Sequence, residues 1–230
     1  MKFEEGLTKG RLIKRYKRFL ADVELETGET VVAHCANSGS MLGLKEAGSL
    51  VYLSANKNPK AKLDWRWELV EVDGSLVGIN TAHPNRIVEQ AILDAEIPEL
   101  RGYKIVRREV KYGQNSRIDL LLEDPGLCYV EVKNVTLREG AKALFPDAVT
   151  ARGTKHLAEL VDMVKLGHRA VMFYLVQRSD CTLFAPATEI DPVYASALRE
   201  AYKAGVEVLC YQCSLTPSEI VIDKVVPLEI

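Results

Sequence analysis

Asp119 and Glu131 are the residues of this sequence whose spacing best suits chemistry on a phosphate. They lie at equal distances from Asp124-Pro125-Gly126, a turn by composition, within two apolar runs rich in β-branched residues. These runs predict a β-hairpin within residues 116–137, in which the two carboxylates fall opposite each other. Carboxylates in that arrangement repel each other unless a positive charge lies between them. Mg²⁺ or Mn²⁺ would supply that charge, since Mg²⁺ prefers oxygen ligands and often binds only one or two protein carboxylates.

Lys133 is the third candidate for the same site. Side chains alternate along a strand, so Arg117 and Asp119 should share one face of the hairpin with Glu131 and Lys133. A bound metal would polarise a phosphoryl oxygen and activate a water molecule, which Lys133 could orient. The alternative is structural, with two solvated ion pairs, Asp119 with Lys133 and Arg117 with Glu131. The other face of the hairpin should belong to the core, with Ile118, Leu120, Val130 and Val132.

The segments around the hairpin predict an α/β domain over residues 83–230. Asn85 suits the N-cap of a helix whose apolar positions continue until Pro98. The predicted order is α-β-β-β-α-β-α-β, in which two of the strands form the hairpin. The remaining elements are a strand at 104–112, a helix at 151–167, a strand at 170–176, a helix at 192–204, a strand at 206–212 and an edge strand within 220–230.

Arg152, Lys155 and His156 lie on the predicted helix that follows the hairpin. Arg152 and His156 are one helical turn apart and therefore lie on the same side of it. Since this helix begins shortly after the proposed metal-binding strand, the three residues are candidates for phosphate contact or for support of Lys133. The alternative is an ordinary solvated helix face.

Residues 1–82 predict a separate β-barrel domain. Turn signals separate six short apolar segments, and five or six such strands in about eighty residues are typical of a small closed or partly open barrel. The OB-fold is the commonest barrel of this size that binds nucleic acid. The expected strands are 7–16, 19–25, 30–35, 49–55, 65–72 and 76–80.

Basic residues gather near the start of this barrel. Lys14, Arg15, Lys17 and Arg18 are interleaved with Tyr16 and Phe19, a pattern that suits a groove that follows phosphates and stacks bases. The alternative is the polar face of an early strand and its turn. The loop at residues 37–41 offers backbone amides that could contact phosphate, or it is only a tight turn. A second group of Lys and Arg residues surrounds Trp65 and Trp67, which could stack bases or lie in the core.

Composition restricts the class of protein. The chain has 230 residues, 47% of them hydrophobic, and a formal net charge of −2, so any nucleic-acid-binding surface must be local. The first residues are charged, and the longest apolar run, 170–176, is far too short to span a membrane, so we expect a cytoplasmic protein without a membrane partner. Five cysteines without framework spacing indicate free thiols, and Cys210-x-x-Cys213 lacks the second pair that a zinc site requires.

The order of these elements, with I-D on one hairpin strand and E-V-K on the next, resembles the PD-(D/E)xK nuclease core. The whole chain more closely resembles the sugar fermentation stimulation protein A family. The motifs that carry this resemblance are R-Y-K-R-F-L-A-D-V (15–23), N-S-G-S-M (37–41), E-V-K-Y-G (109–113), S-R-I-D (116–119), C-Y-V-E-V-K-N-V-T-L (128–137) and F-P-D-A-V-T-A-R-G-T-K-H-L (145–157).

The resemblance implies an N-terminal OB-like domain, a restriction-endonuclease-like α/β domain with a mixed sheet, and DNA binding. It implies Asp119 and Glu131 as metal ligands, the carbonyl of Val132 as a further ligand, and Lys133 as the catalytic lysine. Ile118 takes the place of the proline that names the nuclease motif. That position varies among such nucleases, so the ligand prediction stands.

Two classes of function follow. The first is a metal-dependent phosphodiesterase acting on DNA or RNA. The second is a non-catalytic, largely non-specific DNA-binding regulator of sugar (maltose-type) utilisation genes; the sequence contains no helix-turn-helix pattern that would favour specific binding. A glycosidase is a third interpretation, but Lys133 beside the carboxylates suits phosphoryl chemistry better. No sequence feature marks a dimer face, so monomer and homodimer both stay open.

Overall fold

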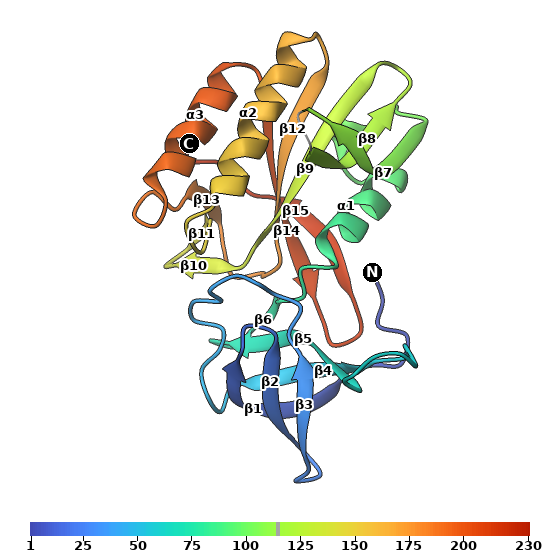
Figure 1. Cartoon of the computed structure of the whole chain (residues 1–230), viewed down its shortest axis with the longest axis vertical. Coiled ribbons are helices and arrows are strands. Elements are labelled where there is room, and N and C mark those ends of the chain that lie inside the picture. Colours follow the sequence, from blue (N-terminus) through green and yellow to red (C-terminus); the bar gives the residue numbers. More distant parts are fainter. Residues whose placement is uncertain (114–115) are drawn as a thin grey trace.

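The computed structural model describes residues 1–113 and 116–230. It consists of a small β-barrel formed by the first part of the chain and a larger α/β body formed by the rest (Figure 1). The predicted order, an OB-type barrel followed by an α/β domain with a mixed sheet, is confirmed.

Five strands close the barrel, and a sixth extends it. The strand order is β3-β2-β1-β4-β5-β6, and a parallel pairing of β3 with β5, Ala33 opposite Trp65, closes the ring. Trp67 is fully buried in the barrel core, so the core interpretation holds for this residue. All six predicted strands are present, with ends within two residues of those expected. They are β1 (Thr8–Tyr16), β2 (Leu20–Leu25), β3 (Thr30–His34), β4 (Leu50–Ala55), β5 (Trp65–Val72) and β6 (Ser75–Gly78).

A six-stranded mixed sheet forms the centre of the α/β body. Its order is β15-β14-β12-β9-β8-β7, with parallel pairing of β9 with β12 and of β12 with β14, and antiparallel pairing elsewhere. The hairpin predicted around Pro125 is present, and the edge strand expected after residue 220 pairs with β14. The strands are β7 (Ile105–Tyr112), β8 (Ser116–Glu123), β9 (Leu127–Val135), β12 (Arg169–Val176), β14 (Glu207–Leu215) and β15 (Ile220–Val225).

Helices cover both faces of this sheet. α2 (Ala151–Lys165) and α3 (Pro192–Lys203) lie side by side on one face, while α1 (Pro84–Leu93) packs on the other (Figure 1). Thr150 caps α2, since its Oγ1 accepts a hydrogen bond of 3.0 Å from the N–H of Gly153. The predicted N-cap of α1 is wrong, because His83 occupies that position and Asn85 lies in the first turn. No helix in the described part of the chain is long and apolar enough to cross a membrane.

The connections hold four elements that the sequence pattern did not predict. A short 3₁₀ helix, η1 (Pro98–Leu100), follows α1. A second, three-stranded sheet consists of β10 (Leu137–Glu139), β11 (Lys142–Phe145) and β13 (Leu183–Pro186). β11 and β13 pair although some forty residues separate them, and this pairing fixes the chain that leads into α2.

Backbone contacts join the barrel to the α/β body. The N–H of Gly78 donates to the carbonyl of Gln177 at 2.8 Å. The N-terminal amino group of Met1 donates to the carbonyl of Ile220 at 2.7 Å, so the chain begins against the β14–β15 hairpin. Two apolar barrel residues, Tyr52 and Leu69, belong to the same buried cluster as α1. Backbone hydrogen bonds and a shared buried cluster therefore hold the barrel against the α/β body.

Candidate active site

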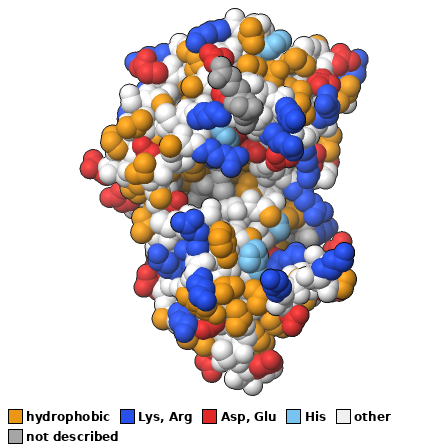
Figure 2. Space-filling view, in the orientation of Figure 1, with side chains coloured by type: hydrophobic (Ala, Val, Ile, Leu, Met, Phe, Trp, Pro, Cys, Tyr) orange, Lys and Arg blue, Asp and Glu red, His pale blue; other side chains and the backbone are white. Residues whose placement is uncertain are grey.

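A cleft of about 390 Å³ lies between the barrel and the α/β body. Its walls come from β8, β9, the starts of α1 and α2, and the barrel loop at residues 37–39. Lys and Arg side chains gather on both sides of the narrow region between the barrel and the α/β body (Figure 2). All members of the predicted metal site and two of the predicted phosphate contacts line the cleft, namely Asp119, Glu131, Val132, Lys133, Arg152 and His156.

Asp119 lies where β8 and β9 separate. The antiparallel pairing of these strands begins beside the turn, where Glu123 lies opposite Leu127, and ends where Leu120 lies opposite Val130. At the next position the side chain of Asp119 enters the ladder, and its Oδ2 accepts a hydrogen bond of 2.8 Å from the N–H of Val132. Its Oδ1 accepts another of 2.8 Å from the side-chain amide of Asn85. Asp119 is thus fixed to both β9 and α1.

This insertion breaks the side-chain alternation that we predicted. Ile118 packs with Tyr112 on the α2 face of the sheet, whereas Leu120 packs on the α1 face. The prediction that Ile118 shares a face with Leu120 is therefore wrong. The neighbouring strand is irregular at the same level, because Glu109 has a φ of +54° and is skipped in the β7–β8 pairing. Strand period alone could not reveal this local break.

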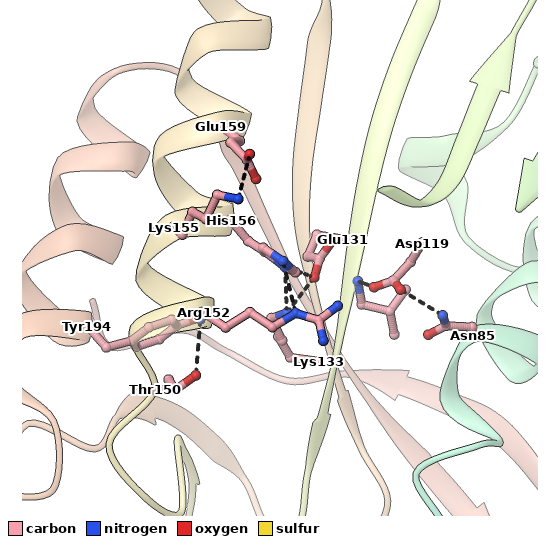
Figure 3. Close-up of polar contacts among 12 residues, drawn as sticks. Asn85, Asp119, Glu131, Lys133, Thr150, Arg152, Lys155, His156, Glu159 and Tyr194 are labelled. Carbon is pink, nitrogen blue, oxygen red and sulfur yellow. Dashed lines mark hydrogen bonds and ion pairs between the residues drawn. The ribbon is translucent and has the colours of Figure 1, made fainter. Parts of the chain in front are cut away.

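Asp119 and Glu131 approach the cleft from opposite sides of β9 (Figure 3), Asp119 on the side of α1 and Glu131 on the side of α2, so the prediction that they share one face of the hairpin is wrong. Glu131 points toward α2 and is only 2% exposed. Its Oε1 accepts from Lys133 Nζ at 2.5 Å and also contacts Nδ1 of His156. Its Oε2 is buried without a hydrogen-bond partner. One oxygen of this carboxylate is therefore fixed, while the other is unpaired.

The tautomer of His156 follows from its neighbour Arg152. The guanidinium Nε of Arg152 donates to Nε2 of His156 at 3.3 Å. A guanidinium has only donors, so Nε2 accepts and the ring proton lies on Nδ1, from which it is donated to Glu131. The ammonium of Lys133 lies 3.3 Å from the same Nδ1, but a protonated Nδ1 cannot accept from it, so the two groups are only in contact. His156 is 4% exposed and faces Glu131 rather than solvent. Of the two roles predicted for it, its position favours support of the site over phosphate contact.

The two carboxylates differ in their electrostatic environment. Burial raises the pKa of Asp119 to about 6, and the negative charge of Glu131 adds to the effect. Burial alone would also raise the pKa of Glu131, but hydrogen bonds and charges from His156 and Lys133 outweigh it and hold that pKa below its usual value. The site thus contains one carboxylate that is well compensated, Glu131, and one, Asp119, whose burial is only partly offset by the charge of Lys133 and by its hydrogen bonds.

Two family models match this chain and show which family it belongs to. The model described as the sugar fermentation stimulation protein RE domain matches residues 82–219, and the one described as the SfsA N-terminal OB domain matches residues 13–79. The chain belongs to the sugar fermentation stimulation protein family.

Curated relatives and a solved structure agree with this assignment. The chain is 60% identical over 222 residues to a sugar fermentation stimulation protein homolog of Paramagnetospirillum magneticum, covering 96% of this chain and 94% of the relative. It is 56% identical to the homolog of Geobacter sulfurreducens, with 96% and 95% covered. The solved structure of Pyrococcus furiosus SfsA in complex with Ca²⁺ is similar with a TM-score of 0.92 at 28% identity, with 100% of this chain and 98% of that chain covered.

The donor set of this family member fits a hard divalent cation. Two carboxylates approach the cleft, and one oxygen of Glu131 is buried and unpaired. The N–H and C=O of one strand residue point to the same edge, so the carbonyl of Val132 faces the gap that holds Asp119. The described residues contain no group of three or more His, Cys, Asp or Glu side chains placed to hold a metal ion by themselves. Two carboxylates and a carbonyl suit Mg²⁺, which keeps several water ligands.

The predicted nucleic-acid contacts fall into two groups. Arg152 is exposed and lines the cleft, whereas Lys155 lies outside the cleft lining and pairs with Glu159 at 3.5 Å. On the barrel, Lys17 and Arg18 are exposed, and Lys14 pairs with Asp22 at 3.4 Å. The group therefore extends from the cleft over the rim of the barrel.

Arg15 has a structural role that the sequence did not indicate. Its guanidinium donates to the carbonyls of Asn37 and Gly39 at 2.8 and 3.1 Å, and so fixes the loop that forms the barrel wall of the cleft. The carboxylate of Asp147 holds the same loop from the other domain, since it accepts from the N–H of Met41 at 3.0 Å. Charged residues on the barrel thus divide into those that build the cleft and those that face solvent.

Asn85 and Asp147 are the site residues that sequence reasoning missed. Asn85 was predicted to be a helix cap, and the pattern held no sign of its bond to Asp119. Asp147 lies within a motif that carried the family resemblance, F-P-D-A-V-T, but nothing in its spacing pointed to the barrel. Both roles depend on contacts between segments far apart in the chain.

Proposed function

We propose that this protein is a cytoplasmic, divalent-metal-dependent nuclease that hydrolyses phosphodiester bonds of DNA. In this proposal residues 1–82 form the nucleic-acid-binding domain and residues 83–230 the nuclease domain. The observation that carries it is the convergence of Asp119, Glu131 and Lys133 on one cleft that both parts of the chain line. The Ca²⁺ complex described for the Pyrococcus furiosus relative supports the use of a divalent cation.

Asp119, the carbonyl of Val132 and Glu131 would hold Mg²⁺ or Mn²⁺. The charge balance supports this assignment, because the pKa of Asp119 is raised, to about 6, by burial and by Glu131, and a cation between the two would relieve the repulsion. When bound, the metal would polarise a phosphoryl oxygen and lower the pKa of a water ligand.

Lys133 is the catalytic lysine in this proposal. Its ammonium lies 2.5 Å from Oε1 of Glu131 and lines the cleft, so it can reach a phosphate there. A positive charge at this position would orient the attacking water and stabilise negative charge that develops on the phosphate. Arg152, exposed on the same wall, would hold the adjoining phosphate through its planar guanidinium.

His156 acts as a positioning residue. Its Nδ1–H and the Lys133 ammonium both donate to Oε1 of Glu131, which leaves Oε2 as the free oxygen of that carboxylate. Arg152 fixes the required tautomer of the ring. Groups of this kind orient metal ligands, and their loss commonly costs about 10–100-fold in metal affinity or activity.

The decisive experiment is cleavage of labelled single-stranded, duplex and branched DNA, with an RNA strand as a further substrate. Each substrate is incubated with Mg²⁺, Mn²⁺ or EDTA and with Lys133→Ala beside the wild type. Lys165→Ala is the matched control, since this exposed lysine lies at the far end of α2 and pairs only locally with Asp162. Metal-dependent cleavage that Lys133→Ala loses and Lys165→Ala keeps is the expected result.

A non-catalytic DNA-binding regulator of sugar (maltose-type) utilisation genes is the second candidate. It is favoured by the close pairing of Lys133 and His156 with Glu131, because these partners compensate the charge of this carboxylate without a metal. DNA binding without cleavage of any substrate, under every metal condition, would support this candidate and reject the nuclease.

A further inference from the structure

We infer that Phe19 and His34 form a stacking site for an unpaired base of single-stranded DNA on the barrel rim. The inference rests on the proposed function. It specifies single-stranded DNA as the substrate class, because the stacking site would bind one strand beside the cleft. Both residues belong to the barrel, and neither takes part in the metal site.

The two rings form an open aromatic surface. Their centroids are 6.4 Å apart and their planes differ by 27°, so they are stacked. Phe19 is 43% exposed, although an aromatic ring of this size normally gains by burial. Base–aromatic stacking gives such an exposed ring a function, since every base offers a π-face and the interaction tolerates any sequence.

Positive charge lies directly beside this aromatic pair. Lys17 and Arg18 precede Phe19 in the β1–β2 turn and are exposed. Their φ angles are +46° and +66°, a region that favours Gly or Asn. The turn keeps two cations at positions where a small residue would be less strained, which indicates a role for their charge. Cations next to an exposed aromatic ring are the combination that binds single-stranded nucleic acid.

The aromatic pair is tied to the wall of the cleft. Arg15 donates to the carbonyl of Arg18 at 3.1 Å and to the carbonyl of Asn37 at 2.8 Å, and so links the turn to the cleft loop. His34 is only three residues before Asn37, so their Cα atoms lie within about 11 Å of each other. A strand whose base stacks on Phe19 would therefore continue into the cleft.

The size of the cleft also favours a single strand. Its volume of about 390 Å³ lies in the range of pockets that hold one small ligand. A single strand can therefore enter this cleft with one nucleotide in contact with its walls. Asp119, Glu131 and Lys133 line the same cleft, so a strand that enters it passes beside them.

Binding of a short oligothymidylate that contains one 2-aminopurine tests this site in EDTA, where no cleavage occurs. We expect Phe19→Ala to weaken binding about tenfold, equivalent to about 1.4 kcal/mol, and to lose the fluorescence quenching that stacking causes. Phe19→Trp should keep both, and Phe19→Leu should lose the quenching. Tyr202→Ala is the matched control, because Tyr202 is an exposed aromatic residue (55%) on α3.

Affinity and quenching of Phe19→Ala equal to wild type, at an unchanged melting temperature, would overturn the stacking site. Equal loss of affinity for single-stranded and duplex DNA would overturn the preference for a single strand. RNA bound as tightly as DNA would overturn the restriction to DNA. None of these results affects the nuclease proposal, which is tested separately by metal-dependent cleavage and its loss in Lys133→Ala.

Discussion

The carboxylate of Asp119 accepts a hydrogen bond of 2.8 Å from the backbone N–H of Val132. This interaction joins β8 to β9 through a side chain at the level where their backbones separate. It also directs the carbonyl of Val132 toward the same gap, because the N–H and C=O of a strand residue share an edge. The side chain of Asp119 therefore lies where the strands separate, and its carboxylate and the carbonyl of Val132 face the same gap.

Asp119→Ala should abolish binding of Mg²⁺ and Mn²⁺ in the cleft while the protein stays folded. The substitution removes a ligand and also one member of a repelling pair of carboxylates, so the fold should tolerate it. Isothermal titration with Mn²⁺ measures the affinity, and thermal unfolding checks the fold. Asp162→Ala, an exposed residue of α2, is the control. Wild-type affinity in Asp119→Ala would contradict the ligand assignment.

Asp119 should make the metal-free protein less stable as pH rises. Burial, with the charge of Glu131, raises its pKa to about 6 in the folded state, above the value of about 3.9 in an unfolded chain. The folded state therefore binds this proton more tightly, and its contribution is complete below about pH 4 and is lost as pH rises through 6. Relative to Asp119→Asn, the wild type should lose about 3 kcal/mol over this range.

Urea unfolding of both proteins at pH 4 to 8 in EDTA measures this difference. Saturating Mg²⁺ at pH 8 should restore stability to the wild type and not to Asp119→Asn. A difference between the two proteins that is constant with pH would show that Asp119 has an ordinary pKa.

His156→Asn and His156→Gln should differ in metal affinity. The amide of Asn can replace the Nδ1–H that His156 donates to Glu131, whereas the longer Gln places its amide near the position of Nε2. We expect Asn to retain most of the affinity for Mn²⁺ and Gln to lose about 10–100-fold. Equal affinities in both variants, measured by titration calorimetry, would mean that the ring only fills space.

Replacing Lys14, Lys17 and Arg18 with Gln should reduce the salt dependence of DNA binding. For every phosphate that is no longer neutralised, the slope of log affinity against log salt should fall by about 0.9 on duplex DNA and about 0.7 on a single strand. Arg15 is left intact because it holds the cleft loop. A matched triple variant of exposed lysines on the α/β body, Lys165, Lys203 and Lys224, provides the control. An unchanged slope would show that these three barrel residues face solvent and do not contact phosphate.

Glu68 should stabilise the junction between the barrel and α1. It is 3% exposed and accepts hydrogen bonds from Ser54, Asn80 and His83 at 2.6 to 2.7 Å. Burial alone would raise its pKa, but these partners outweigh it and lower the pKa. Its stabilising effect is therefore present above its unfolded pKa and lost as pH falls through the lower folded value. Glu68→Gln should cost about 2 kcal/mol near pH 7, by chemical unfolding, and less below pH 4.

The sequence determined most of the secondary structure and which residues are available to the site. Strands β1 to β6, the β8–β9 hairpin and α2 were predicted because apolar period and turn residues act over a few neighbouring positions. Equal distances from the turn placed Asp119 and Glu131 at the same level of paired strands. The family motifs added the carbonyl of Val132 and the assignment of Lys133.

The tertiary structure decided how these groups are oriented. Asp119 turned toward α1 and Glu131 toward α2, because each found a partner, Asn85 and His156, on a segment distant in the chain. It also gave the basic residues of the barrel different roles. Arg15 donates hydrogen bonds to the cleft loop, whereas Lys17 and Arg18 are exposed to solvent. A local pattern fixes backbone conformation over a few residues, whereas the direction of a polar side chain depends on which distant donors folding brings within hydrogen-bond reach.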